Sequence, residues 1–417
     1  MDAAPADRKA TPADRRARFP GALAESQFRR FVAGSFLWGT AYQLLTLAQG
    51  YTLFQLTDST AYLAALGATT GVPQVVTPIV GGFLNDRFPR RRLLMAGSLA
   101  MLAAMAVLTA VYVAGALEPW HILAAGVIHG SVLGIDWTTR QSMVPSVVSR
   151  DRLVSGVAID LGMFNLARVV APLAGGMVLA SLGGPATYGL IAGLFAANLL
   201  MISSIHRIPS VARDGAHAIW GDTAEALKAV WRDQVIGINI VFTAVNGLLV
   251  GGIVYLMPAY AKDVVDTGAR GLSWLYAALG VGAFAASTWL SISGGIRRAG
   301  PGLIASNLVF AAACAAFAIS GSLWFALATA IAASFFNTIH ISLGVAALQL
   351  ASSDDMRGRV FGIYEVAWGA FPLGGLALGA LASASDLRIA LLTGSAAVAL
   401  FTIAVFVASR RIRNLVF

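Results

Sequence analysis

Five charged side chains interrupt long apolar segments of this sequence: Asp136, Arg140, Asp160, Arg168 and Glu365. A charged group near the centre of a bilayer costs about 2.5–3.5 kcal/mol on insertion scales, so such groups face a cavity or one another. A carboxylate there can bind a proton from one side of the membrane and release it to the other. An arginine stays charged and can instead bind an anion or hold a carboxylate ionised. Such charges can therefore bind a ligand or exchange a proton inside a membrane, or they can pair with one another to pack helices.

The spacing of these charges suggests different roles. Asp136 and Arg140 are four residues apart, so they share a helix face and can neutralise each other. Asp160 and Glu365 lie about two turns inside the fifth and eleventh apolar segments. Arg168 follows Asp160 by two further turns on the same face and has no partner nearby in sequence. We expect Arg168 to face a cavity, with Asp160 as the first proton-coupling candidate, then Glu365, then Asp136.

Uncharged polar residues in the first and seventh apolar segments are further candidates for lining a cavity. A role in hydrogen bonds between helices explains them equally well. These residues are Tyr42, Gln43, Gln49, Asn239 and Asn246.

The remaining polar residues exclude several kinds of active site. Cys314 is the single cysteine, and no cluster of His, Cys or carboxylate residues has the spacing of a metal site. The sequence also lacks a glycine-rich loop ending in Gly-Lys-Ser/Thr, so ATP hydrolysis is excluded as an energy source. We expect no cofactor, no metal and no enzymatic activity.

The composition is that of a polytopic membrane protein. Of 417 residues, 58% are hydrophobic and 12% are charged, about half the charged fraction of a soluble domain. The mean hydropathy is +0.75. The net charge of +9 comes from short segments between apolar runs, which indicates anionic lipids as the partner and not nucleic acid.

Twelve apolar segments are long enough to span a bilayer as helices. They predict an all-α membrane protein with two halves of six helices, at 28–205 and 235–409. A tail at 1–27, a linker at 206–234 with an amphipathic helix, and a tail at 410–417 complete the chain. Lys and Arg are concentrated in alternate connections, which predicts that both termini are cytoplasmic. The expected segments are approximately 30–54, 61–84, 93–115, 120–147, 153–181, 185–205, 235–261, 271–293, 301–319, 322–350, 357–382 and 387–409.

The connection after the second segment carries a charged motif with characteristic spacing. It consists of Gly82, Asp86, Arg87, Arg90 and Arg91, with proline at position 89. It resembles the loop between helices two and three of the major facilitator superfamily, which usually has glycine where this proline stands. The resemblance implies that these residues, with Arg357 and Arg359 at the start of the eleventh segment, control the closing of one face of the protein.

Three further stretches resemble one branch of the superfamily, the enterobactin exporters and macrolide efflux proteins. They are 136–145, 166–176 and 355–362. The second resembles the antiporter motif of the family, with Pro172, Gly175 and Gly176 expected to pack helices closely. A proline followed by paired glycines recurs at 372–375, as a duplicated six-helix unit predicts.

The resemblance implies a monomeric transporter in the inner membrane that exports a small amphipathic molecule, such as a drug, siderophore or secondary metabolite, in exchange for protons. Two alternatives keep the fold: uptake of a metabolite, and lipid flipping. A membrane scaffold or sensor that transports nothing is a third, although it would have no need of Arg168.

Overall fold

The computed structural model describes residues 22–149, 152–206, 230, 232–293, 296, 298–352 and 354–416. Most of the predicted amphipathic linker helix and most of the amino-terminal tail therefore lie outside the described residues.

Every regular element in the described ranges is a helix. Ten helical stretches there are long and apolar enough to cross a membrane, which makes the chain a multi-pass membrane protein. In order, the elements are η1 (Ala22–Ala24), α2 (Ser26–Thr57), α3 (Thr60–Arg87), α4 (Arg90–Val113), α5 (Pro119–Val147), α6 (Leu153–Ser203), α8 (Gln234–Asp263), α9 (Gly268–Ser293), α10 (Ala299–Ile319), α11 (Leu323–Ala351), α12 (Asp354–Trp368), α13 (Ala370–Ala384), α14 (Leu387–Ala408) and α15 (Arg410–Arg413).

The break in α6 comes at Gly183. Its φ of 79° and ψ of −174° are non-helical, and glycine adopts such a conformation without the strain of a Cβ. Pro185 follows two residues later and fits the start of a new helix. This reversal separates the predicted segments 153–181 and 185–205.

The predicted segment 357–382 corresponds to one span, Val360–Ala384, which consists of two successive helices. α12 ends at Trp368, Gly369 forms a turn, and α13 begins at Ala370. The cause is Pro372, which has no N–H group to donate to the carbonyl of Trp368 one turn earlier.

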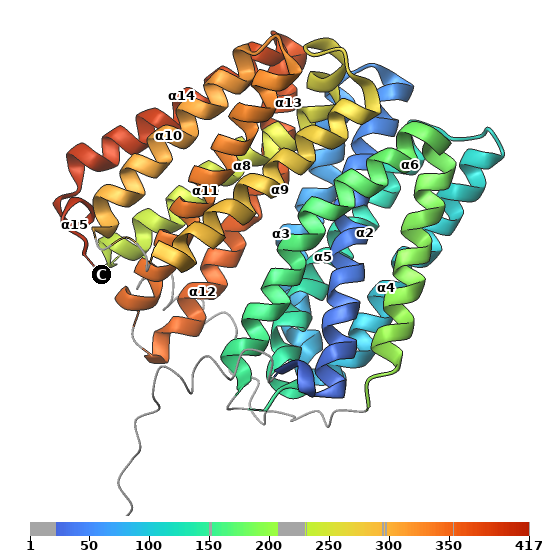
Figure 1. Ribbon diagram of the computed structural model, residues 1–417, viewed down its shortest axis with the longest axis horizontal. Helices are drawn as coiled ribbons and strands as arrows, with labels where there is room; N and C mark the ends of the chain where they lie inside the picture. The colour runs from blue at the N-terminus through green and yellow to red at the C-terminus, as the bar shows by residue number, and fades with distance from the viewer. Residues whose placement is uncertain are drawn as a thin grey trace, which may run out of the picture.

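Figure 1 shows the helices gathered in two bundles, α2–α6 and α8–α15. We call these the first and the second bundle. They meet along two seams, α3 with α13 and α6 with α9. Glycines make the approach close: a Cβ on Gly67 would lie 2.8 Å from the carbonyl oxygen of Pro372, and one on Gly280 would lie 2.8 Å from that of Arg168.

Among the described residues, buried apolar clusters that contain both bundles lie at one end of the molecule. There Phe54 and Leu63, of the first bundle, belong to the same cluster as Met257 and Tyr260 of the second. An ion pair of 2.6 Å joins Asp58 after α2 to Lys262 near the end of α8. We call this end the Lys262 end.

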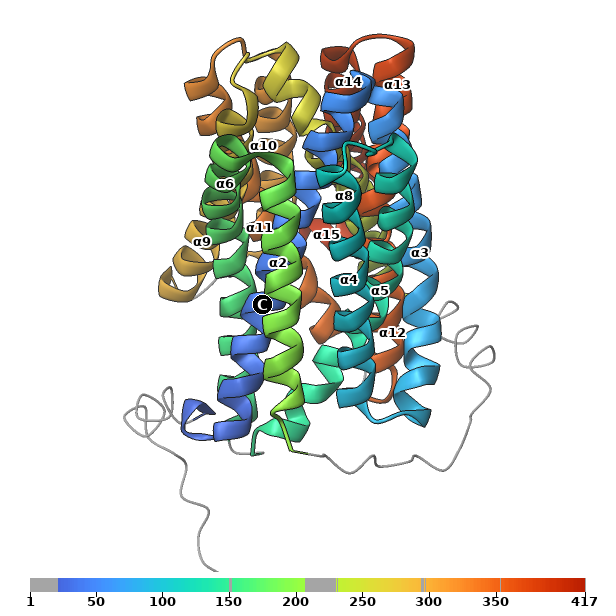
Figure 2. The same cartoon turned by 90° about the vertical axis from the view of Figure 1, so that its right-hand side faces the viewer.

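At the opposite end, each described apolar cluster belongs to one bundle. Phe28, Leu94 and Ile202 pack together within the first bundle, while Ile236 and Tyr364 pack within the second. In Figures 1 and 2 this is the end where α2 and α4 begin. We call it the Arg91 end. The described part of the structure is therefore closed at the Lys262 end, where apolar packing and an ion pair join the bundles.

Candidate polar sites in the two bundles

Asp136 and Arg140 are both buried in α5, and the indole of Trp38 from α2 lies with both of them. Nε1 of Trp38 donates a 3.0 Å hydrogen bond to Oδ2 of Asp136. The Arg140 guanidinium lies 4.5 Å from the centroid of the same indole, in a cation–π contact. The structure gives no ion pair within 4 Å between these two described side chains. They are linked through Trp38, whereas local pairing was the expectation from the sequence.

Arg140 has several further partners. Its two terminal nitrogens donate to Oγ of Ser35 at 3.1 Å and to Oδ1 of Asn198 at 3.2 Å. Nδ2 of Asn198 in turn donates to Oγ of Ser98 at 2.8 Å. Arg140 also interacts electrostatically with both Asp136 and Asp160. One arginine therefore lies near two carboxylates from different helices, without an ion pair within 4 Å to either in the described structure.

Each of these carboxylates has a buried oxygen, Oδ1, without a hydrogen-bond partner in the described structure. For Asp136 this atom is turned toward α4, where a Cβ on Gly97 would lie only 2.5 Å away. Because Gly97 has no side chain, α4 leaves room for the carboxylate. The arrangement keeps an acceptor available for a proton.

Tyr42 and Gln49 lie buried on α2 beside His129 of α5. A 3.0 Å hydrogen bond joins Nδ1 of His129 to Oε1 of Gln49, and the rings of Tyr42 and His129 are 5.1 Å apart. Both predicted residues thus contact α5 inside the first bundle in this arrangement. Gln43, between them in sequence, is half-buried.

The second bundle has its own buried polar network. Nδ2 of Asn246 on α8 donates to Oδ1 of Asn307 at 2.7 Å, and Asn307 donates to Oγ1 of Thr402 at 2.8 Å. Asn239, two turns earlier, donates to its own helix at the carbonyl of Val235.

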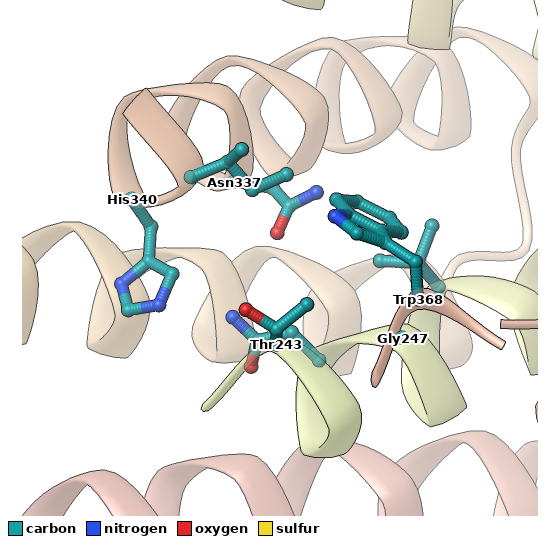
Figure 3. A pocket seen from close by; sticks show the side chains of 8 residues that line it. Thr243, Gly247, Asn337, His340 and Trp368 are labelled. Atoms are coloured by element: carbon teal, nitrogen blue, oxygen red, sulfur yellow. The ribbon is translucent and has the colours of Figure 1, made fainter. Parts of the chain in front are cut away.

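A small pocket adjoins this network. In Figure 3 the Asn337 amide lies between His340 and the indole of Trp368, above Thr243. The lining residues are Thr243, Asn246, Gly247, Val250, Asn337, His340, Ile341 and Trp368. Of the predicted cavity residues, Asn246 belongs to this lining and Asn239 does not.

Arg168 on α6 differs from Arg140. It is half-buried, and no hydrogen bond, ion pair or charged neighbour is found for it among the described residues. Within the described ranges, no partner for Arg168 comes from other helices either.

The residues of the antiporter-like motif lie at close helix contacts. Pro172, Gly175 and Gly176 are all buried. A Cβ on Gly175 would lie 2.0 Å from a methyl group of Leu44, and one on Gly176 would lie 1.5 Å from Oγ of Ser273. The first contact is within the first bundle, while the second crosses to α9.

The motif between α3 and α4 is partly described. Arg87 is exposed at the end of α3. Arg90 donates to Oγ of Ser146 at 2.9 Å, and Arg91 donates to the carbonyls of Ile202 and Ser203. These two arginines thus bind the ends of α5 and α6 in their own bundle. The predicted residues Gly82, Asp86, Arg357, Arg359 and Glu365 have side-chain positions outside the described part of the structure.

Comparison with known proteins decides the family. The sequence profile of the transmembrane secretion effectors, a family of major facilitator transporters, matches residues 21–415. The chain belongs to this family. It is a transporter of the major facilitator type and not an enzyme, as the motifs predicted.

The chain is similar to characterised exporters of this superfamily. It is 25% identical over 338 residues to the multidrug efflux pump Tap of Mycolicibacterium fortuitum, covering 79% of this chain and 82% of Tap. It is 28% identical over 364 residues to the enterobactin exporter EntS of Salmonella typhi, covering 84% and 85%. A crystal structure of a mutant of the nucleoside transporter NupG superposes with a TM-score of 0.75 at 15% identity, covering 92% and 99%.

Several polar residues of this secretion effector were not predicted from sequence. Trp38, Asn198 and Asn337 each contribute to a polar site from a different helix. A lone amide in an apolar segment, such as Asn198, is a signal that could have been used, because amides inside membranes bind other helices. Trp38 carries no such signal, since a tryptophan in an apolar segment can also pack in purely apolar surroundings.

Proposed function

We propose that this chain is a secondary active exporter of the inner membrane, acting as a monomer, which exchanges a small amphipathic organic molecule for protons by alternating access. The observation that carries the proposal is that, among the residues the structure describes, apolar clusters and an ion pair join the bundles at the Lys262 end. Two bundles in contact at one end can rock about a central site and open it to one side at a time. Polar and charged side chains in the bundle interiors supply groups for such a site.

The topology we propose has twelve spans in two six-helix halves, 28–205 and 235–409. In this topology, α6 supplies two spans, one on either side of Gly183. The helices α12 and α13 together form one span, and α3 is also a span. The two seams support a duplication, because the fifth span packs on the eighth and the eleventh on the second. A second sign is a buried hydrogen bond between the third and last spans of each half, Ser98 with Asn198 and Asn307 with Thr402.

The orientation follows from charge. Arg90, Arg91, Arg298 and the arginines of α15 belong to the Arg91 end, whereas Lys262 is at the opposite end. Because cytoplasmic connections carry the excess of Lys and Arg, we assign the Arg91 end to the cytoplasm. Both termini are then cytoplasmic, and the arrangement described here is open toward the cytoplasm.

Proton coupling is assigned to the carboxylates near Arg140. Asp136 and Asp160 compete for this one arginine, and each has an oxygen without a hydrogen-bond partner. Two carboxylates sharing one cation favour uptake of a proton by one of them. Glu365 is the third candidate, on the second bundle. The substrate class is taken from the relatives, whose names specify multidrug efflux and enterobactin export.

Transport into everted membrane vesicles tests the function. Labelled enterobactin and a fluorescent efflux dye should each be offered to vesicles with and without an inward-acid proton gradient. We expect gradient-dependent accumulation of at least one compound, which is lost in the Asp160→Asn protein. Gradient-dependent loss of compound from the vesicle lumen would indicate uptake into cells instead. Accumulation that ignores the gradient would exclude proton coupling.

A further inference from the structure

The helix α6 presents Arg168 toward the space between the bundles. A Cβ on Gly39 of α2 would contact Phe164 and Ala167, and a Cβ on Gly280 of α9 would contact Val169. Each residue turns an α-helix by 100°, so Arg168 lies between the face that contacts α2 and the face that contacts α9.

Exposure along α6 agrees with this position. Val157 and Leu161 are 48% and 54% exposed, and they precede Arg168 by eleven and seven residues, which places them on its face. A separate exposed stripe on the far side of the helix includes Val170 and Met177. The stripe with Val170 and Met177 lies on the side of α6 that suits lipid. The stripe with Val157 and Leu161 lies on the opposite side, and we assign it to the space that separates the bundles toward the Arg91 end.

In the part of the chain that the structure describes, the Arg168 guanidinium has no charged or hydrogen-bonding partner. Arg140 donates hydrogen bonds to a serine and an amide and interacts electrostatically with two carboxylates. Arg168 has no such partner in the described structure. A half-buried cation without a counter-charge is costly inside a membrane. An anion that enters this space would remove that cost.

Two aromatic rings lie about one helical turn from Arg168 along α6. Phe164 is one turn before Arg168, and its ring lies 5.3 Å from that of Trp137, edge to face. Both rings are partly exposed, unlike the buried Trp38 behind them. A cation beside partly exposed rings suits a ligand that combines an anionic group with a flat apolar body.

We propose that Arg168, with Phe164 and Trp137, binds the anionic group and the ring of the transported molecule, so that the substrate is an aromatic organic anion. This inference rests on the proposed export function and specifies its substrate class. Arg168 pairs with the anion, and the two rings contact its apolar part.

Cysteine protection tests the binding site without requiring transport. The Leu161→Cys substitution puts a thiol on the Arg168 face, and the native Cys314 is buried, so a maleimide reports on the new thiol. The probes are 2-naphthoate and its uncharged isostere 2-naphthamide, at neutral pH. We expect naphthoate to slow labelling at concentrations at least about tenfold lower than naphthamide, as a charge-assisted hydrogen bond would allow.

Variants in the Leu161→Cys background separate the site from general charge. Arg168→Gln should abolish the preference for naphthoate, and Arg168→Lys should retain part of it. Arg92→Gln, which removes an exposed cation at the Arg91 end, should leave it unchanged. Equal protection by both probes, protection by neither, or a preference that survives Arg168→Gln would overturn the proposal.

The two proposals fail in different ways. If naphthoate binds through Arg168 and no compound moves in vesicles, the export function is wrong and the anion site stands. If vesicles accumulate uncharged or cationic compounds equally well in Arg168→Gln protein, export stands and the substrate class is wrong.

Discussion

A methyl group at position 176 should shift the protein away from the arrangement described here. The Cβ of Gly176→Ala would lie 1.5 Å from Oγ and 2.2 Å from Cβ of Ser273. Rotation of the serine hydroxyl cannot relieve the second contact, so α6 and α9 must move apart. Overpacking of this kind costs about 1–3 kcal/mol. Because the contact crosses between the bundles, that cost falls on the state in which the Lys262 end is closed.

The expected shift follows from this cost. A difference of 1.4 kcal/mol changes an equilibrium tenfold, so the closed Lys262 end should lose about 5- to 150-fold in population relative to the alternative state. The assay is the rate at which an impermeant maleimide labels the Leu161→Cys thiol in everted vesicles. We expect slower labelling in the Gly176→Ala protein. Gly176→Leu, with a larger side chain, should abolish transport.

Gly162→Ala is the matched control. It lies on the same helix, and its Cβ would meet no atom within 4 Å. Its labelling rate should equal that of the parent protein. If the thiol in folded Gly176→Ala protein is also labelled at the parental rate, the α6–α9 contact is the same whether the Lys262 end is closed or open. That result would refute the expected shift.

Three more substitutions test other contacts. Lys262→Gln removes the exposed ion pair with Asp58 and should slow the labelling of the Leu161→Cys thiol by less than about fivefold. This effect should vanish in high salt, and an effect that persists in high salt would exclude the ion pair as its cause. Gly97→Ala should displace the Asp136 carboxylate and lower stability by about 1–3 kcal/mol, seen as a lower melting temperature in detergent, whereas an unchanged temperature would contradict the packing. Asp86→Asn should destabilise the state closed at the Arg91 end and speed labelling of cysteines on the cytoplasmic side, with expression unchanged; equal rates would remove Asp86 from the gate.

The sequence predicted the helices well because apolar length alone decides where a chain can cross a bilayer. The segment ends predicted at positions 54 and 115 are within a few residues of Thr57 and Val113, where α2 and α4 end. The segment predicted at 357–382 corresponds to the span Val360–Ala384. The local break in its hydrogen bonds at Gly369 was not predicted, because proline is tolerated in membrane helices and its effect depends on neighbouring carbonyls.

The polar sites were less predictable than the helices. The candidates Asp136 and Arg140 were found because charge in an apolar segment is conspicuous. Their connection through Trp38 depends on how α2 packs on α5, and a residue 98 positions away gives no local signal. The role of Arg168 stays a prediction. The pairing of the Trp137 ring with Phe164, one turn from Arg168, depends on the packing of α5 against α6 and has no local signal in the sequence.

The central claim is that the two bundles open at alternate ends. Distances between spin labels test it directly, with one pair at Gln55 and Asp266 across the Lys262 end and another at Arg92 and Arg298 across the Arg91 end, all exposed positions. When the pH difference across a reconstituted membrane is changed, we expect two populations of distances for each pair, and the first distance should lengthen as the second shortens. One unchanging distance for each pair, or both distances lengthening together, would contradict it.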